Sequence, residues 1–200
     1  MTEARSGSRG PGPERGAFDA VVARRSHPQV TVEAPTRSKL LRLLNAAAGV
    51  ADHGSLHPWR LIEVRGAARE RLGAAFVQAS SLEGEEAARL AAKPLRAPLL
   101  IAVVAVHVPS IKVPEWEQDA AASGVAHMLS LLLDEAGWGV MWRTGPLTRS
   151  APVHAMHALS DNEKLMGWLY VCRALDDASR AKDAVRRDDA WVDGLLSELT

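Results

Sequence analysis

The longest helical pattern of the chain runs from Glu115 to Ala136. Its polar residues fall on one narrow stripe at helical spacing, and apolar residues cover most of the remaining circumference. Pro114 stands just before the first turn and Gly137 just after the last, so both ends are defined. The pattern predicts a helix that is buried on nearly all sides. The polar stripe consists of Asp119, Ser123, His127, Ser130 and Asp134.

A short β-like segment, Val140 to Trp142, follows this helix and leads into a polar turn, Arg143-Thr144-Gly145-Pro146. A polar turn at the tip of an element that a rigid core holds can present backbone N–H groups and side chains to a ligand. The same local pattern is, more often, a plain surface turn beside a buried Trp. The segment by itself leaves both interpretations open.

Helical patterns recur along the rest of the chain. An amphipathic helix from Ala17 ends in Arg24-Arg25-Ser26-His27, and two adjacent arginines on a helix point in different directions, so at most one faces inward. Thr36 caps a helix that reaches about Ala48. Further helices are predicted at 66–79, 83–92 and 148–159. A short terminal helix is predicted at 191–199, docked by Trp191, Val192, Leu195 and Leu196.

Three further apolar runs, at 61–64, 99–106 and 165–171, predict strands. The run 99–106 is apolar throughout and is bounded by Pro98 and Pro109, which places it in the middle of a sheet. Strands and helices together predict an α+β fold with a central mixed sheet, one long buried helix and flanking helices. Residues 1–16, rich in Gly, Pro, Ser and Arg, predict a disordered tail, and residues 17–200 a single domain.

Composition narrows the functional classes. Lys and Arg number 24, as do Asp and Glu, so no global field attracts nucleic acid or an anionic membrane, and an anion site must be local. The longest apolar run contains Pro98 and is too short for a membrane span, and the N-terminus lacks the apolar core of a secretory signal. Cys172, the single cysteine, excludes an internal disulfide and fits a reducing cytoplasm.

The loop before the first strand holds two histidines, His53 and His57, but no convincing metal site or catalytic group. Gly54 and Pro58 oppose the helix that would bring both rings to one metal ion, and no acidic third ligand stands at a suitable spacing. A triad drawn from Ser55, His57 and Asp52 would consist of sequence neighbours, and no nucleophile elbow follows a strand. We therefore expect no metal and no catalytic nucleophile.

Three separated segments are together similar to the FMN-dependent nitroreductase family, in particular its small bacterial branch. They are Arg24-Arg25-Ser26, the loop 52–60, and the stretch from 112–119 through Trp142-Arg143-Thr144-Gly145. The resemblance covers about residues 17–175 in one order. It implies a nitroreductase-like fold and a homodimer with FMN bound at the subunit interface.

The resemblance also implies roles for particular residues. Arg24, Arg25 and Ser26 would meet the FMN phosphate and ribityl or ring edge, since a guanidinium suits phosphate oxygens. Trp142, Arg143 and Thr144 would line the flavin, and His53 would reach the flavin that the other subunit binds. The long helix would form the core of the dimer interface. NAD(P)H would reduce the flavin, and a nitroaromatic or quinone-like small molecule would accept the electrons, so the protein itself needs no catalytic residue.

The chain departs from the family pattern at a few positions. Gly49 stands where relatives of this branch have a basic residue that holds FMN across the dimer, and His57 replaces a common Gln. After Arg173 the resemblance fades, although Arg186 or Arg187 could supply a late cation. Two alternatives therefore stay open: a flavin-binding relative without turnover, and a flavin-free dimeric interaction module.

Overall fold

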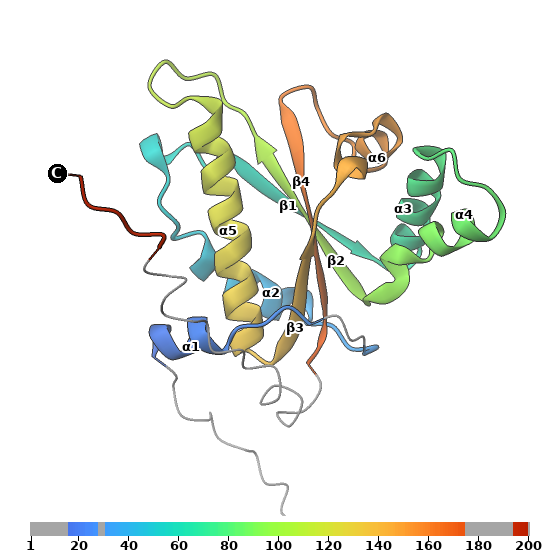
Figure 1. Ribbon diagram of the computed structural model, residues 1–200, viewed down its shortest axis with the longest axis horizontal. Coiled ribbons are helices and arrows are strands. Elements are labelled where there is room, and N and C mark those ends of the chain that lie inside the picture. The colour runs from blue at the N-terminus through green and yellow to red at the C-terminus, as the bar shows by residue number, and fades with distance from the viewer. Residues whose placement is uncertain (1–15, 28–30, 175–193, 200) are drawn as a thin grey trace, which may run out of the picture.

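The computed structural model describes residues 16–27, 31–174 and 194–199. Its centre is a four-stranded sheet in the order β1-β2-β4-β3 (Figure 1). The strands are β1 (Trp59–Arg65), β2 (Leu99–Val106), β3 (Trp138–Arg143) and β4 (Glu163–Arg173). The prediction of strands in these four regions, with 99–106 inside the sheet, is confirmed.

The sheet is antiparallel at every pairing, so the prediction of a mixed sheet was wrong. Two helices connect β1 to β2 and return the chain to the end it left, where Arg65 pairs with Leu99. A single helix connects β2 to β3, which would suit a parallel pair, but β4 inserts between these strands and runs antiparallel to both. The hydrophobic pattern of a strand does not specify the direction of its partner, so the sequence could not predict that every pair is antiparallel.

Six α-helices and three short 3₁₀ turns lie within the described ranges. The first four helices agree with the predicted bounds. The helix expected at 148–159 is divided, because Ser150 is extended and a new helix with Pro152 in its first turn follows it. The α-helices are α1 (Ala17–Ala23), α2 (Arg37–Ala47), α3 (Ala67–Gln78), α4 (Gly84–Ala91), α5 (Glu115–Glu135) and α6 (Ala151–Met156). The 3₁₀ turns are His53–Ser55, Lys93–Arg96 and Pro146–Arg149.

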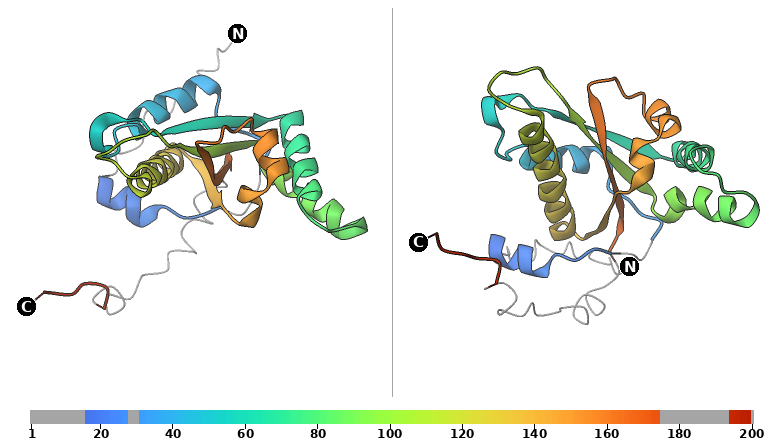
Figure 2. Two further views of the ribbon diagram at one scale, coloured as in Figure 1. Left: turned by 90° about the horizontal axis from the view of Figure 1, so that it is seen from above. Right: turned by 45° about the horizontal axis from the view of Figure 1, so that its top comes forward.

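Two hydrophobic clusters lie on the two faces of the sheet. Helices α2 and α5 cover one face, and α3, α4 and α6 lie toward the other (Figure 2). Alternate residues of β2 enter alternate clusters: Leu99, Ile101 and Val103 pack toward α5, and Leu100 and Val104 pack toward α3. A strand with apolar residues on both faces is what a central position requires.

The long helix α5 is less buried than its sequence predicts. Asp134 and Ser130, from the predicted polar stripe, are buried, while Trp116 is 68% exposed and Met128 and His127 are also exposed. Ser130 satisfies its hydroxyl by donating to the carbonyl of Ala126 at 2.7 Å. The prediction that α5 is buried on nearly all sides is therefore wrong for a single chain, because Trp116 and Met128 remain exposed among the described residues.

The predicted C-terminal helix is absent from residues 194–199, which form a turn and coil in which Leu195 and Leu196 are exposed. So short a segment without packing partners does not sustain a helix. Residues 191–193, and residues 1–15 of the tail predicted at 1–16, lie outside the described residues. Among the described segments, no helix has the length and apolar character to cross a membrane.

Candidate functional site

The end of β3 presents the polar turn that the sequence suggested. The indole of Trp142 packs edge-on against the ring of His127 in α5, with 5.1 Å between ring centroids. Arg143 points to the other face, where its guanidinium lies 5.2 Å from the ring centroid of Tyr170. Trp142 Nε1 and Arg143 Nε are buried and lack a hydrogen-bond partner in the described part of the chain. Thr144 is exposed at the tip.

Gly167 in β4 makes this arrangement possible. Its φ is +129°, and a Cβ there would lie 2.5 Å from the Arg143 carbonyl oxygen and 2.8 Å from Trp142 Nε1. A β-bulge in β4 next to Gly167 shifts the register against Val103 and Val104. Glycines and bulges of this kind occur where a backbone must approach a neighbour closely. The end of β3 is therefore fixed by a position that only glycine fills without strain.

The segment that follows α1 lies beside β3 and is attached at two points. The backbone N–H of His27 donates to the carbonyl of Val140 at 3.0 Å, and His27 Nε2 lies 3.0 Å from Asp134 Oδ1. Asp134 is buried near the C-terminal end of α5. The residues Arg24, Arg25 and Ser26 are therefore held next to the strand that ends in Trp142, Arg143 and Thr144.

The two arginines of this segment differ in their contacts. Arg25 Nη1 donates to the carbonyls of Val22 and Arg24, the latter at 2.8 Å, so this cation caps the C-terminal end of α1, where positive charge is favourable. Arg24 is half-buried, and its side chain has no hydrogen bond or ion pair with a residue of the described ranges.

His53 lies apart from the Arg24–Ser26 segment within one chain. It lies in the 3₁₀ turn His53–Ser55, 56% exposed, with Nδ1 at 2.7 Å from Glu117 Oε2 near the start of α5. Asp134, beside which the Arg24–Ser26 segment lies, follows Glu117 by 17 positions, about 25 Å along a helix. Gly49 follows the end of α2, is exposed, and does not have a left-handed φ.

A polar network near the start of α5 was missed by the sequence analysis. His107 Nε2 lies 3.0 Å from Asp119 Oδ1, and Lys164 of β4 pairs with the other oxygen of Asp119. Burial acts to raise the pKa of Asp119, but hydrogen bonds from Lys164 and His107 outweigh it and hold this pKa below its ordinary value. The network joins the loop after β2 to α5, and only the folded topology brings these three residues together.

Comparison with known proteins places this geometry in a family. A model described as "Nitroreductase family" matches residues 21–173, which contain all seven predicted site residues. The chain belongs to the nitroreductase family. It is 34% identical over 160 residues to "Putative NAD(P)H nitroreductase YdjA" of Escherichia coli strain K12, covering 78% of this chain and 86% of that relative.

Solved structures show the same nitroreductase fold. A nitroreductase-like family protein from Bacillus cereus superimposes with a TM-score of 0.73 at 23% identity, over 84% of this chain and 90% of that chain. The "FMN and NADPH-dependent nitroreductase NfnB" from sphigopyxis sp. strain HMH gives 0.70 at 16% identity, over 93% of this chain and all of that chain (100%). The predictions of the family and of a nitroreductase-like α+β fold are confirmed.

Proposed function

We propose that this nitroreductase-family protein binds FMN and transfers electrons from NAD(P)H to a nitroaromatic or quinone-like acceptor. The observation that carries the proposal is the attachment of the Arg24–Ser26 segment to β3 through His27 and Val140. Arg24, a cation without a described partner, lies on this segment, and the last two residues of β3, Trp142 and Arg143, carry buried N–H groups without an acceptor among the described residues. Buried donors in that state are rare and call for an explanation such as a ligand.

The residues present fit FMN. Arg24 would bind the phosphate, with Ser26 and Thr144 adding hydroxyls, because charge-assisted bonds from a guanidinium to phosphate are strong. Arg25 would keep the end of α1 in place, as its contacts with two backbone carbonyls suggest. Trp142 and Arg143 would line the ring at the end of β3, Trp142 through its side chain and Arg143 through its backbone. Bound FMN supplies the hydride and electron transfer, and these side chains bind and orient it.

A homodimer would complete this site. His53 of the same chain is far from Arg24, so we propose that His53 of the partner subunit reaches the flavin. The exposed stripe of α5, with Trp116 and Met128, and the exposed face of α1, with Phe18 and Val22, provide apolar surface of the kind that marks interfaces. The single cysteine, Cys172, is buried in β4 and fits a reducing cytoplasm.

Purification followed by anaerobic reduction tests the proposal. A dimeric yellow protein whose flavin is bleached by NADPH under nitrogen and recoloured by a nitroaromatic is the expected result. Yellow protein that neither NADH nor NADPH bleaches would instead identify a flavin-binding relative without turnover. Colourless protein that ignores added FMN would refute both and leave a dimeric interaction module.

Substitution of Arg24 tests the assignment of the phosphate contact. Arg24→Ala should weaken FMN binding about tenfold or more, since one charge-assisted contact contributes about 1.5–3 kcal/mol. Arg71→Ala, on the exposed side of α3, removes the same charge elsewhere and should leave the affinity unchanged. Equal affinities of Arg24→Ala and the unmodified dimer would show that the segment is only a helix end.

A further inference from the structure

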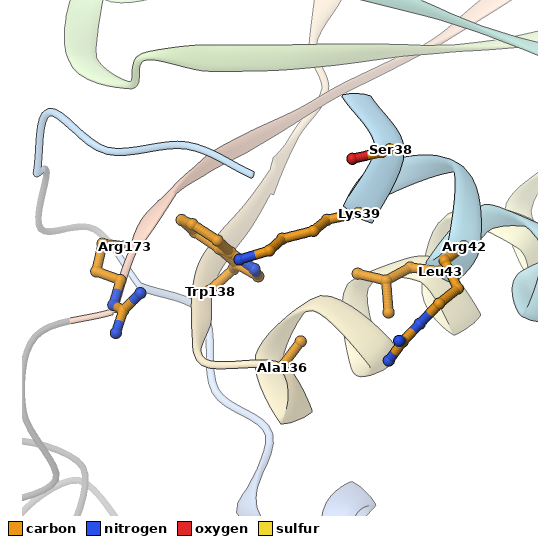
Figure 3. A pocket seen from close by; sticks show the side chains of 7 residues that line it. All are labelled: Ser38, Lys39, Arg42, Leu43, Ala136, Trp138 and Arg173. Atoms are coloured by element: carbon orange, nitrogen blue, oxygen red, sulfur yellow. The ribbon is translucent and has the colours of Figure 1, made fainter. Parts of the chain in front are cut away.

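We propose a second ligand site, for a phosphate group carried on a flat ring as in a nucleoside monophosphate, in a cavity between α2 and the start of β3. The cavity has a volume of about 400 Å³, within the range of small-molecule sites. Lys39 and Arg42 of α2, Trp138 of β3 and Arg173 of β4 line it (Figure 3). None of these residues belongs to the predicted flavin site.

The charged side chains among the described residues that line this cavity are all positive. They are Lys39, Arg42 and Arg173, and no carboxylate of the described ranges lines it. Arg173 has one long contact, 3.9 Å, with Glu33, while Lys39 and Arg42 form no ion pair with a residue in the described ranges. All three side chains are exposed, and a dianionic phosphate in the cavity would give them charge-assisted contacts.

The cations of α2 lie near its N-terminal end. The helix carries Arg37, Lys39 and Arg42 in its first two turns, with no acidic residue in the first turn. This is the positive end of the helix dipole, where cations are unfavourable and anions are favoured. Arg37 is neutralised by an ion pair with Glu63, on a different side of α2 from the cavity. Lys39 and Arg42 are left facing the cavity without such a partner among the described residues.

An apolar wall faces the cations. Trp138, Leu43 and Ala136 form it, and the side chain of Lys39 extends toward the indole (Figure 3). The guanidinium of Arg173 lies 5.6 Å from the centroid of the Trp138 ring, which holds that cation at the edge of the cavity. A cationic rim beside an aromatic wall recognises a ligand with an anionic end and a flat apolar body.

The site lies apart from the Arg24–Ser26 segment. Helices α1 and α2 lie on opposite sides of α5, as the view from above shows (Figure 2). Trp138 stands at the first residue of β3, whereas Trp142 and Arg143 stand at its last two. The two sites share no predicted ligand-binding residue, so AMP binding can be measured both with and without FMN.

Calorimetric titration with 5′-AMP tests the proposal, on the full protein both saturated with FMN and without added flavin. AMP should bind in both preparations, and adenosine and inorganic phosphate should each bind at least about tenfold more weakly, because each lacks one half of the recognised group. Lys39→Ala and Arg42→Ala should each weaken AMP binding about tenfold. Arg37→Ala removes the same charge from the same helix and should leave AMP binding unchanged.

Four outcomes would overturn the second site. One is no detectable AMP binding in either preparation, and another is equal binding of adenosine and AMP, which would leave the cations without a role. The third is an equal loss in Arg37→Ala, Lys39→Ala and Arg42→Ala, which would reveal only a general attraction to a basic helix. AMP binding that Arg24→Ala abolishes and Lys39→Ala leaves intact would likewise assign AMP to the other site.

Discussion

The contact between His27 and Asp134 gives the sharpest test of how the candidate flavin site is positioned. His27 Nε2 lies 3.0 Å from Asp134 Oδ1, while the backbone N–H of His27 bonds separately to the carbonyl of Val140. Replacing His27 by Ala removes the first contact and keeps the second. The segment with Arg24, Arg25 and Ser26 would then be attached to the core by its backbone alone.

The magnitude follows from the surroundings of this pair. The side chains of His27 and Asp134 are 17% and 4% exposed, so solvent screens the contact little. A hydrogen bond to a charged group contributes about 1.5–3 kcal/mol. Asp134 has a further interaction, so the larger penalty of an unpaired buried charge does not apply. If the variant loses this energy in the flavin-bound state alone, the Kd for FMN should rise about ten- to a hundredfold.

Quenching of FMN fluorescence, titrated against protein freed of flavin, measures this Kd. His27→Gln keeps a side-chain N–H that can reach Asp134, so it should recover part of the affinity. Leu90→Ala in α4, remote from the segment, should cost about 2–5 kcal/mol of folding stability and serves as a control for general destabilisation. The reasoning is refuted if His27→Ala lowers the melting temperature but leaves the Kd for FMN unchanged, or if Leu90→Ala weakens FMN equally.

Three further outcomes follow from single positions. Gly49→Arg should tighten FMN binding about threefold to tenfold by adding a cation at an exposed position with ordinary φ, as titration against a Gly49→Ala control would measure. Gly167→Ala should destabilise the fold by about 1–3 kcal/mol in denaturant melts and should weaken FMN binding. Gly137→Ala is the control: Gly137 has a φ of +84° but open space around an added Cβ, so this variant measures backbone strain without crowding. Burial lowers the pKa of His157, so on acidification the unfolded chain binds a proton at this residue before the folded chain does. Stability should therefore fall as the pH drops below about 6.5. A His157→Gln variant whose melting temperature depends on pH in the same way between pH 6.5 and 5 would contradict that assignment.

Sequence patterns predicted the elements whose signals are local. Thr36 caps α2 by accepting a hydrogen bond from the Lys39 N–H, and the apolar run 99–106 coincides with β2. The pairing direction of the strands was not predictable, because the pattern of β4 is the same whichever way its neighbours run. The exposure of α5 was mispredicted for a related reason, since an apolar stripe on a helix does not reveal whether its own chain covers it.

The residues of the candidate site also divide into those that a local sequence pattern predicts and those that only a contact with a distant segment reveals. Arg24-Arg25-Ser26 and Trp142-Arg143-Thr144 could be found because each is a short contiguous segment, and the family resemblance linked them. The residues that hold them in place, His27, Asp134 and Gly167, could not be found, because each acts through one contact with a distant segment. Asp134 illustrates the difficulty: its spacing assigned it to a polar stripe on α5, yet it is buried and bonded to His27.

His53 and the Arg24–Ser26 segment are attached near opposite ends of α5. The ring of His53 pairs with Glu117 at the start of α5, whereas the Arg24–Ser26 segment is fixed near the end of that helix. The two attachment points are about 25 Å apart along α5, so we expect His53 to reach the flavin from the partner subunit and not from the chain that supplies Arg24. The proposed dimer predicts the behaviour of a monomeric variant. Met128→Glu, which places a charge on the exposed side of α5 and should prevent dimer formation, should lose FMN affinity even though Arg24 and Trp142 are intact. Undiminished flavin binding by such a monomer would show that His53 has no part in the site.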